Sequence, residues 1–167
     1  FAKSEIVPSN KDRFLRKETL QGFVHDEASA FFGGLAGNAG LFSTARDVAR
    51  VYQMLLNGGE IDGQRYLSKE TCQLFTTEIS KISRCGLGFD KPDADDPKKG
   101  NCAPAAPAEV YGHTGFTGTC AWVDPMNELV YVFLSNRIYP DVTNRKLNQL
   151  HIRERIQGAI YDAMKKK

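Results

Sequence analysis

The stretch that decides the fold is Tyr111-Gly-His-Thr-Gly-Phe-Thr-Gly-Thr119. Threonines alternate with three glycines beside a histidine, and β-rich runs follow at once. Glycine within a strand allows another backbone or a ligand to approach closely. His113 supplies a titratable group, and the hydroxyl of Thr114 supplies a hydrogen-bond donor. The stretch therefore predicts a strand that contacts a ligand or, equally, a bulged edge strand with a structural histidine.

The sequence around this stretch predicts an antiparallel sheet. We expect a strand over residues 110–114. The runs 119–123 and 129–134 lie on either side of Asp124-Pro-Met-Asn127, which is typical of a hairpin turn. Trp122 lies inside the first of these runs, and we expect it to pack in the core.

Four other segments carry weaker signals. Residues 85–89 predict a further short strand, and the Pro-, Asp-, Lys- and Ala-rich segment 90–108 predicts an exposed loop. Residues 1–21 mix charged and apolar positions without a sustained period, so we expect extended chain and loop. Residues 22–42 contain five glycines among large apolar side chains, which predicts a buried loop with tight turns.

Helical spacing of apolar residues predicts three helices. The first follows the N-cap Thr44 and ends at Gly58, and the second begins after Ser68 and ends near Phe75. The last is expected over residues 144–164. Its predicted apolar face consists of Ile152, Ile156, Ala159, Ile160 and Ala163. Helices combined with antiparallel strands predict an α+β fold, with an antiparallel sheet flanked by helices.

Composition excludes several classes of function. The 167 residues suit one domain, and 22 basic against 20 acidic residues give a net charge of +2. This balance argues against a nucleic-acid partner, and no stretch has the roughly 20 apolar residues of a membrane-spanning helix. The four cysteines form no Cys-x-x-Cys pair, and we expect four free thiols. The three histidines lack the spacing of metal ligands, so no metal and no cofactor are expected.

Several motifs together resemble one enzyme family. His113-Thr114-Gly115 is similar to the Lys-Thr-Gly strand motif of penicillin-binding proteins and serine β-lactamases, in the His-Thr-Gly form of esterase-like relatives. The glycine-rich segment 33–47, the segment 57–71 and the run Leu134-Ser-Asn-Arg137 resemble further parts of that family. The resemblance extends over about residues 22–164, and the nearest subgroup is the class C-like β-lactamase-related hydrolases. One departure is Asn38, where relatives often carry histidine.

The resemblance implies acyl transfer by a serine in a Ser-x-x-Lys motif, assisted by a Tyr-x-Asn or Ser-x-Asn segment. None of these motifs occurs in the 167 residues. In the family both lie N-terminal to the part matched here. The resemblance therefore implies that residues 1–167 are the C-terminal half of a β-lactamase/transpeptidase-like domain. We expect this half to lack the nucleophile and to be inactive by itself.

The resemblance also implies roles for individual residues. His113 would act in catalysis, Thr114 and Gly115 would contact substrate, and the N–H of Phe116 or Thr117 would face the developing oxyanion. A Val-His-Asp sequence recurs in relatives, which implies that His25 and Asp26 lie near the cleft and that the carboxylate orients the imidazole. A loop histidine hydrogen-bonded to its neighbour is the alternative. At the end of a strand, Arg137 would either bind a substrate carboxylate or form an ordinary ion pair.

The expected partners follow from the same resemblance. They are a small-molecule or peptide acyl substrate and the missing N-terminal half of the domain. Because half a domain would expose apolar surface, we also expect a homodimer of the isolated chain. A periplasmic or cell-envelope location is implied only by the resemblance. The alternative function is a non-catalytic module that binds cell-wall or peptide ligands.

Overall fold

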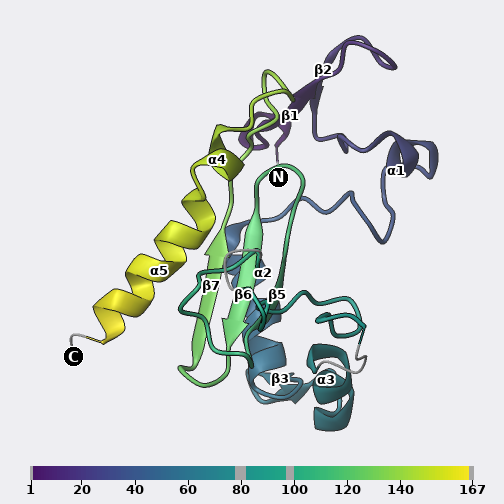
Figure 1. Cartoon of the computed structure of the whole chain (residues 1–167). Helices are drawn as coiled ribbons and strands as arrows, with labels where there is room; N and C mark the ends of the chain where they lie inside the picture. The colour runs from purple at the N-terminus through teal and green to yellow at the C-terminus, as the bar shows by residue number, and fades with distance from the viewer. Residues whose placement is uncertain (1, 78–81, 97–99, 166–167) are drawn as a thin grey trace.

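Three antiparallel strands lie at the centre of the computed structural model, which describes residues 2–77, 82–96 and 100–165 (Figure 1). The order of the strands is β5-β6-β7, so each strand pairs with its neighbour in sequence. Two small two-stranded sheets, β1-β2 and β3-β4, complete the strand pairing. The α+β class with antiparallel sheets is therefore confirmed. The elements in chain order are η1 (Lys3–Glu5), β1 (Pro8–Lys11), β2 (Thr19–Gln21), α1 (Glu27–Phe31), α2 (Ala45–Leu56), β3 (Glu60–Ile61), β4 (Gln64–Arg65), α3 (Lys69–Thr76), β5 (Tyr111–Thr114), β6 (Cys120–Asp124), β7 (Leu129–Phe133), α4 (Lys146–Gln149) and α5 (Ile152–Met164).

One face of the central sheet carries the main core. In this core cluster, Trp122 of β6 is only 1% exposed and lies opposite Tyr131 of β7. Side chains two residues apart on a strand share a face, so Cys120 lies beside Trp122. Residues from the preceding loop and from α5 cover this face: Cys102, Ala106, Val110 and Ile160. The expectation that Trp122 packs in the core is confirmed.

Helix α2 covers the opposite face of the sheet, where it contacts β6 and β7 (Figure 1). Thr44 accepts a hydrogen bond from the N–H of Asp47, as the sequence predicts, and the helix has Asn57 as its C-cap, next to the predicted end at Gly58. Tyr52 of α2 meets the ring of Phe89 edge-on, and Phe89 meets Tyr111 of β5 in the same way. Burial of apolar and aromatic surface on both faces is what holds β6 at the centre.

Gly112 allows the sheet to close over Trp122. A Cβ at this position would lie 2.1 Å from the carbonyl oxygen of Ala121 and 2.7 Å from the indole ring. Neither the strand backbone nor a fully buried indole has room to move away. Gly112 is therefore required for packing, because no side chain larger than a hydrogen atom fits between β5 and Trp122 of the neighbouring strand.

The turn between β6 and β7 is fixed by a buried carboxylate. Asp124 is 2% exposed, and it accepts hydrogen bonds from the backbone N–H groups of Met126 and Asn127 at 2.9 and 3.1 Å. It also accepts the hydroxyl of Tyr161 from α5 at 2.8 Å. These bonds satisfy an anion that would otherwise be costly to bury, and they join the hairpin to the last helix.

The C-terminal helix differs from the prediction in two ways. It is broken into α4 and α5, because His151 adopts a left-handed conformation with φ 48°. Its most buried residues carry polar groups: Arg153, Gln157 and Tyr161 are inside, whereas Ile156 is 39% exposed. The reason is that these residues meet backbone and carboxylate groups at the ends of strands and loops, which long polar side chains can satisfy. Of the predicted apolar face, Ile160 packs against the core cluster.

Two predictions for residues 85–108 are wrong in the described part. No strand forms over 85–89, and an isolated bridge joins the next residue, Asp90, to Gly112. The segment 90–108 is not an exposed loop throughout. Cys102 and Ala103 are 3% and 2% exposed, and the N–H of Ala103 donates to the Gln157 side chain at 2.8 Å. Residues 97–99 of the predicted loop lie outside the described residues.

The N-terminal segment also departs from expectation. Residues 1–21, expected to be extended chain and loop, contain the paired strands of the β1-β2 hairpin. The glycine-rich loop 22–42 is not buried. Phe31, Phe32 and Leu41 are 78%, 78% and 84% exposed. This exposed apolar surface is the kind that favours self-association. The homodimer stays a prediction.

Cys72, Cys85, Cys102 and Cys120 are free thiols. Burial raises the pKa of Cys102 to about 12 and that of Cys120 to about 11, so both are neutral at physiological pH. Among the described residues, no helix has the length and apolar content that crossing a membrane requires. Within those residues, no cluster of three or more potential metal ligands is found either.

The close approach at Gly112 leads to a stability prediction. The substitution Gly112→Ala should lower the free energy of unfolding by about 1–3 kcal/mol, because the added methyl overlaps backbone and indole. Gly158→Ala is the matched control. Gly158 lies inside α5, and its added Cβ would meet only the Cβ of Ala103, at 4.0 Å. The control substitution should therefore raise the stability by about 0.5–1 kcal/mol. Urea unfolding measures both, and equal effects of the two substitutions would contradict this packing role.

Candidate active site

The turn between β5 and β6, residues 115–119, lies at the centre of the candidate site. The N–H of Gly115 donates to the carbonyl of Thr119 at 2.8 Å, and the N–H of Gly118 donates to the carbonyl of Gly115 at 2.9 Å. A Cβ at position 115 would lie 2.3 Å from the hydroxyl oxygen of Thr119. Gly118 has φ +106°, a conformation that residues with side chains rarely adopt. Both glycines are therefore required by this tight turn.

The carbonyl groups of the turn are held by residues on its other side. The carbonyl of Thr117 accepts the backbone N–H of Arg137 at 2.9 Å, and that of Gly118 accepts the Ser135 hydroxyl at 2.9 Å. The Arg153 guanidinium donates to the carbonyl of Thr119 at 3.2 Å. The segment that follows β7 and helix α5 therefore fix the backbone of this turn.

Not every N–H group of the described turn is paired. In the part of the chain that the structure describes, no hydrogen bond is formed by the backbone N–H of Phe116 or of Thr117. The Phe116 side chain is 61% exposed, so this part of the turn faces outward. An anchored turn with unpaired donors is suited to binding an oxygen atom that carries negative charge.

His113 and Thr114 precede the turn on β5. His113 is exposed, and its Nδ1 lies 2.7 Å from the carbonyl oxygen of Thr114. Because a carbonyl only accepts, Nδ1 carries the proton in the neutral ring and Nε2 is left as an acceptor. Successive side chains on a strand point to opposite faces, so His113 and Thr114 lie on different faces of β5. A bound molecule would reach both of them only along the edge of this strand.

His25 contacts the turn from a distant part of the sequence. Its ring stacks on Phe116 with a centroid distance of 5.4 Å and an interplanar angle of 1°. Its Nδ1 is buried and has no hydrogen-bond partner among the described residues. Burial, and next the nearby Arg16 guanidinium, lower the pKa of His25 below its ordinary value. The fold thus brings His25 and Phe116, which are far apart in the sequence, into contact at one site.

Asp26 does not orient the imidazole of His25 in the described structure. Its carboxylate caps helix α1 by accepting the N–H of Ser29 at 2.7 Å, and it accepts the side-chain amide of Asn38 at 3.3 Å. Asn38 in turn accepts the Ser29 hydroxyl at 3.1 Å. These hydrogen bonds lower the pKa of Asp26. Asn38 therefore joins the glycine-rich loop to the start of α1.

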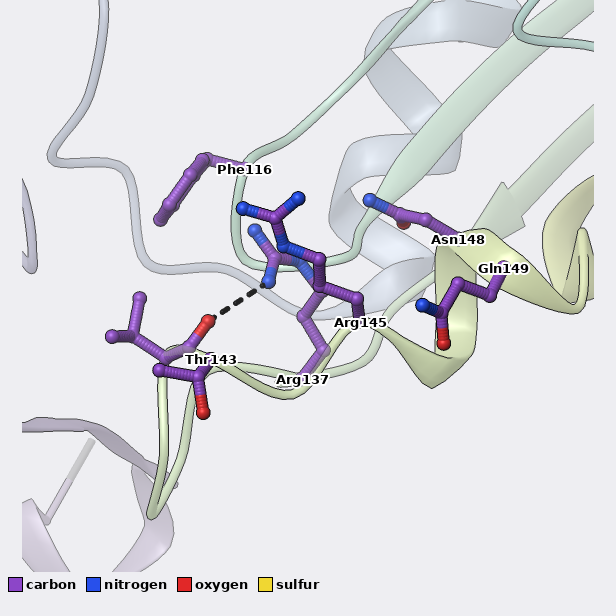
Figure 2. Close-up of a pocket in the computed structure, with 7 residues that line it drawn as sticks. Phe116, Arg137, Thr143, Arg145, Asn148 and Gln149 are labelled. Carbon is purple, nitrogen blue, oxygen red and sulfur yellow. Dashed lines mark hydrogen bonds between the residues drawn. The ribbon is translucent and has the colours of Figure 1, made fainter.

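An open pocket of about 760 Å³ adjoins the turn (Figure 2). The Arg137 guanidinium lies 4.6 Å from the centroid of the Phe116 ring and donates to the carbonyl of Asn144 at 3.1 Å. Burial, then the charges of Arg145 and Arg153, lower the pKa of Arg137. No acidic side chain is among the lining residues, which are Phe116, Arg137, Val142, Thr143, Arg145, Asn148 and Gln149. The pocket is therefore basic, with one aromatic wall.

Of the residues that line this pocket, Phe116 and Arg137 were predicted from the sequence as site residues and the others were not. Arg145, Asn148 and Gln149 reach it because helix α4 ends there, whereas a single helix over 144–164 was expected. The ion pair considered for Arg137 is not formed within the described residues, where its recorded polar contacts are backbone carbonyls. No local sequence signal marks α4 as part of a pocket.

The burial of His25 leads to a pH prediction. The unfolded chain takes up a proton on this residue near pH 6.5, whereas the folded chain does so at lower pH. The unfolded state therefore binds more protons in this window, and stability should fall as the pH drops from about 7 to about 5. Asp12, Asp26 and Glu27 nearby act in the opposite direction and limit the effect.

The measurement is urea unfolding of the wild type and of His25→Gln across this pH range. The substitution removes the titrating group, so its unfolding free energy should decline less steeply towards low pH. Parallel pH profiles for the two proteins would show that His25 does not titrate differently on folding.

Comparison with known proteins identifies the family. The beta-lactamase family model matches residues 6–154. A protein of Escherichia coli (strain K12) named "Putative D-alanyl-D-alanine carboxypeptidase" is 36% identical over 135 residues, which are 80% of this chain and 31% of the relative. Proteins of the same name from Salmonella agona and Salmonella typhi match to the same extent. The chain thus spans about a third of the length of these curated relatives. On this evidence, and as the motifs predict, the chain belongs to the beta-lactamase family.

Proposed function

We propose that this chain is the C-terminal part of a serine hydrolase domain that catalyses acyl transfer. In this proposal it supplies the cleft wall formed by His113, Thr114, Gly115 and the following turn. The nucleophile comes from residues outside these 167, because Ser-x-x-Lys and Tyr-x-Asn are absent from the sequence. The chain is therefore inactive by itself. Membership of the beta-lactamase family supports this reading.

The observation that carries the proposal is the pair of unpaired N–H groups at Phe116 and Thr117. Attack on an ester or amide carbonyl places negative charge on its oxygen, and preorganised backbone donors stabilise that charge. The neighbouring carbonyls are already hydrogen-bonded to Arg137, Ser135 and Arg153, so the turn need not reorganise as the charge develops. A turn held in this way is suited to the oxyanion site of an acyl-transfer enzyme.

His113 is proposed to exchange protons at its Nε2 atom. The Nδ1 contact with the Thr114 carbonyl holds the ring in one tautomer and leaves Nε2 accessible as an acceptor. Thr114 would hydrogen-bond the substrate from the other face of the strand. His25 would contribute indirectly through its ring contact with Phe116. Asp26 would act only by holding α1 and the glycine-rich loop in place.

The basic pocket suggests the class of acyl substrate. Arg137 and Arg145 are among its described lining residues, none of which is acidic, so a carboxylate beside the scissile bond would find complementary charge there. The relatives are named as carboxypeptidases for D-alanyl-D-alanine, whose peptides end in a carboxylate. We therefore favour a small peptide or peptide-like acyl donor with a free carboxylate as the substrate.

Covalent labelling tests the proposal. A fluorescent β-lactam and a fluorophosphonate should label a serine of the full-length gene product, whereas the 167-residue chain should stay unlabelled. If neither protein is labelled, a non-catalytic module that binds cell-wall or peptide ligands becomes the better reading. Labelling of the 167-residue chain would contradict the proposed absence of a nucleophile, and mass spectrometry would locate the modified residue.

Substitution of His113 tests its role in proton transfer. In the full-length protein, His113→Gln should lower kcat by about 10²–10⁴-fold, because the amide cannot exchange a proton. Thermal stability should change little, because the side chain is exposed. The control is His151→Asn, which removes another exposed histidine and retains a residue that tolerates the left-handed conformation. Turnover equal to that of the wild type would rule out the role of His113.

Substitution of Arg137 tests recognition of the carboxylate. Arg137→Met keeps a long side chain against Phe116 but removes the charge, so KM for a peptide with a free carboxylate should rise by about tenfold or more. KM for the matching peptide amide should stay nearly constant. Arg155→Met, an exposed arginine outside the pocket, is the control. An unchanged preference for the free carboxylate would place its recognition elsewhere.

A further inference from the structure

A buried carboxylate begins a chain of contacts that reaches the candidate site. Asp12 is 5% exposed, and it accepts the backbone N–H groups of Phe14, Leu15 and Arg16. It also accepts the Nε–H of Arg16 at 2.8 Å. Four donors to one carboxylate hold its pKa well below the usual range. Asp12 therefore remains charged, and it orients the Arg16 guanidinium.

The other two nitrogen atoms of Arg16 bind neighbouring carbonyl groups of a separate segment. Nη1 donates to the carbonyl of Val24 at 2.8 Å, and Nη2 donates to that of His25 at 2.9 Å. The planar guanidinium thus binds three acceptors in a fixed fork geometry, which the point-like ammonium group of lysine does not reproduce. We call Asp12 and Arg16 together the Asp12–Arg16 clamp.

The segment held by the clamp carries the ring that packs on Phe116. With the backbone of residue 25 fixed, the His25 imidazole lies parallel to the Phe116 ring. No hydrogen bond within the described residues holds this imidazole, since its Nδ1 is buried without a partner. The backbone contacts of Arg16 are therefore the polar interactions that keep His25 against the turn.

We propose that Arg16 is a positioning residue of the proposed active site. By binding the carbonyls of Val24 and His25, it holds the His25 ring on Phe116 and so fixes the turn of residues 115–119. This inference rests on the proposed function, because the turn is taken to supply the oxyanion donors. Arg16 itself makes no recorded contact with the turn or with the lining of the pocket.

The first test is spectroscopic and needs no catalysis. In the NMR spectrum of the 167-residue chain, Arg16→Lys and Arg16→Met should shift the imidazole resonances of His25 and the amide resonances of Phe116 and Thr117. The pKa of His25 should rise towards its ordinary value as burial decreases. Arg13→Met, an exposed arginine three residues earlier, is the control and should leave these signals unchanged. Unshifted Phe116 and Thr117 amides in both Arg16 variants would overturn the proposal.

The second test is a double-mutant cycle in the full-length protein. Arg16→Lys should lower kcat by about tenfold to a hundredfold with little change in KM, since a small displacement of the oxyanion donors impairs the reaction rather than binding. In a His25→Ala background the same substitution should cost almost nothing, because the two residues act along one path. Additive effects would overturn the proposal.

The two tests separate the possible failures. If the wild-type full-length protein has no hydrolase activity, the proposed function fails, and the amide shifts still decide whether Arg16 positions the turn. If Arg16→Met does not fold, Arg16→Lys retains the charge beside Asp12 and provides the comparison. If the wild type is active and the kinetic cycle is additive, the proposed function stands and the positioning role fails.

Discussion

The packing of one indole beneath a glycine is the constraint on which the rest of the structure depends. Trp122 fills the core at the centre of β6, and Gly112 is the residue on β5 that leaves room for it. This fit fixes the register of the two strands, since a shift by one residue would exchange their faces. The same register places His113 opposite Ala121 and sets where β5 ends and the turn begins.

The candidate site is built around that turn from three separate parts of the chain. The turn supplies unpaired N–H groups, the segment after β7 supplies Arg137, and the N-terminal segment supplies His25. Phe116 contacts both of the latter side chains, so it is the residue through which the two segments meet. A site made in this way depends on tertiary contacts at least as much as on its motif.

Sequence patterns identified the parts of the fold that local chemistry determines. The cap at Thr44 and the Asp124 hairpin follow from side chains that bond to their own neighbouring backbone, which a sequence reveals directly. The buried polar residues of α5 could not be found in this way. Periodicity selects apolar residues, whereas Arg153 and Gln157 are inside because distant backbone groups need partners. For the same reason the motif identified the turn but gave no sign of Arg16 or of the α4 side of the pocket.

The buried polar residues of α5 limit how this helix can evolve and move. Arg153, Gln157 and Tyr161 each bond to a different structural element: the turn after β5, the loop before it and the β6–β7 hairpin. A rotation or a one-residue slide of the helix would break all three hydrogen bonds together, whereas an apolar face would tolerate many small adjustments. These three side chains therefore fix both the rotation and the axial position of the helix. We therefore expect substitutions to be tolerated on its outward side, and changes at these three positions to require matching changes in their partners.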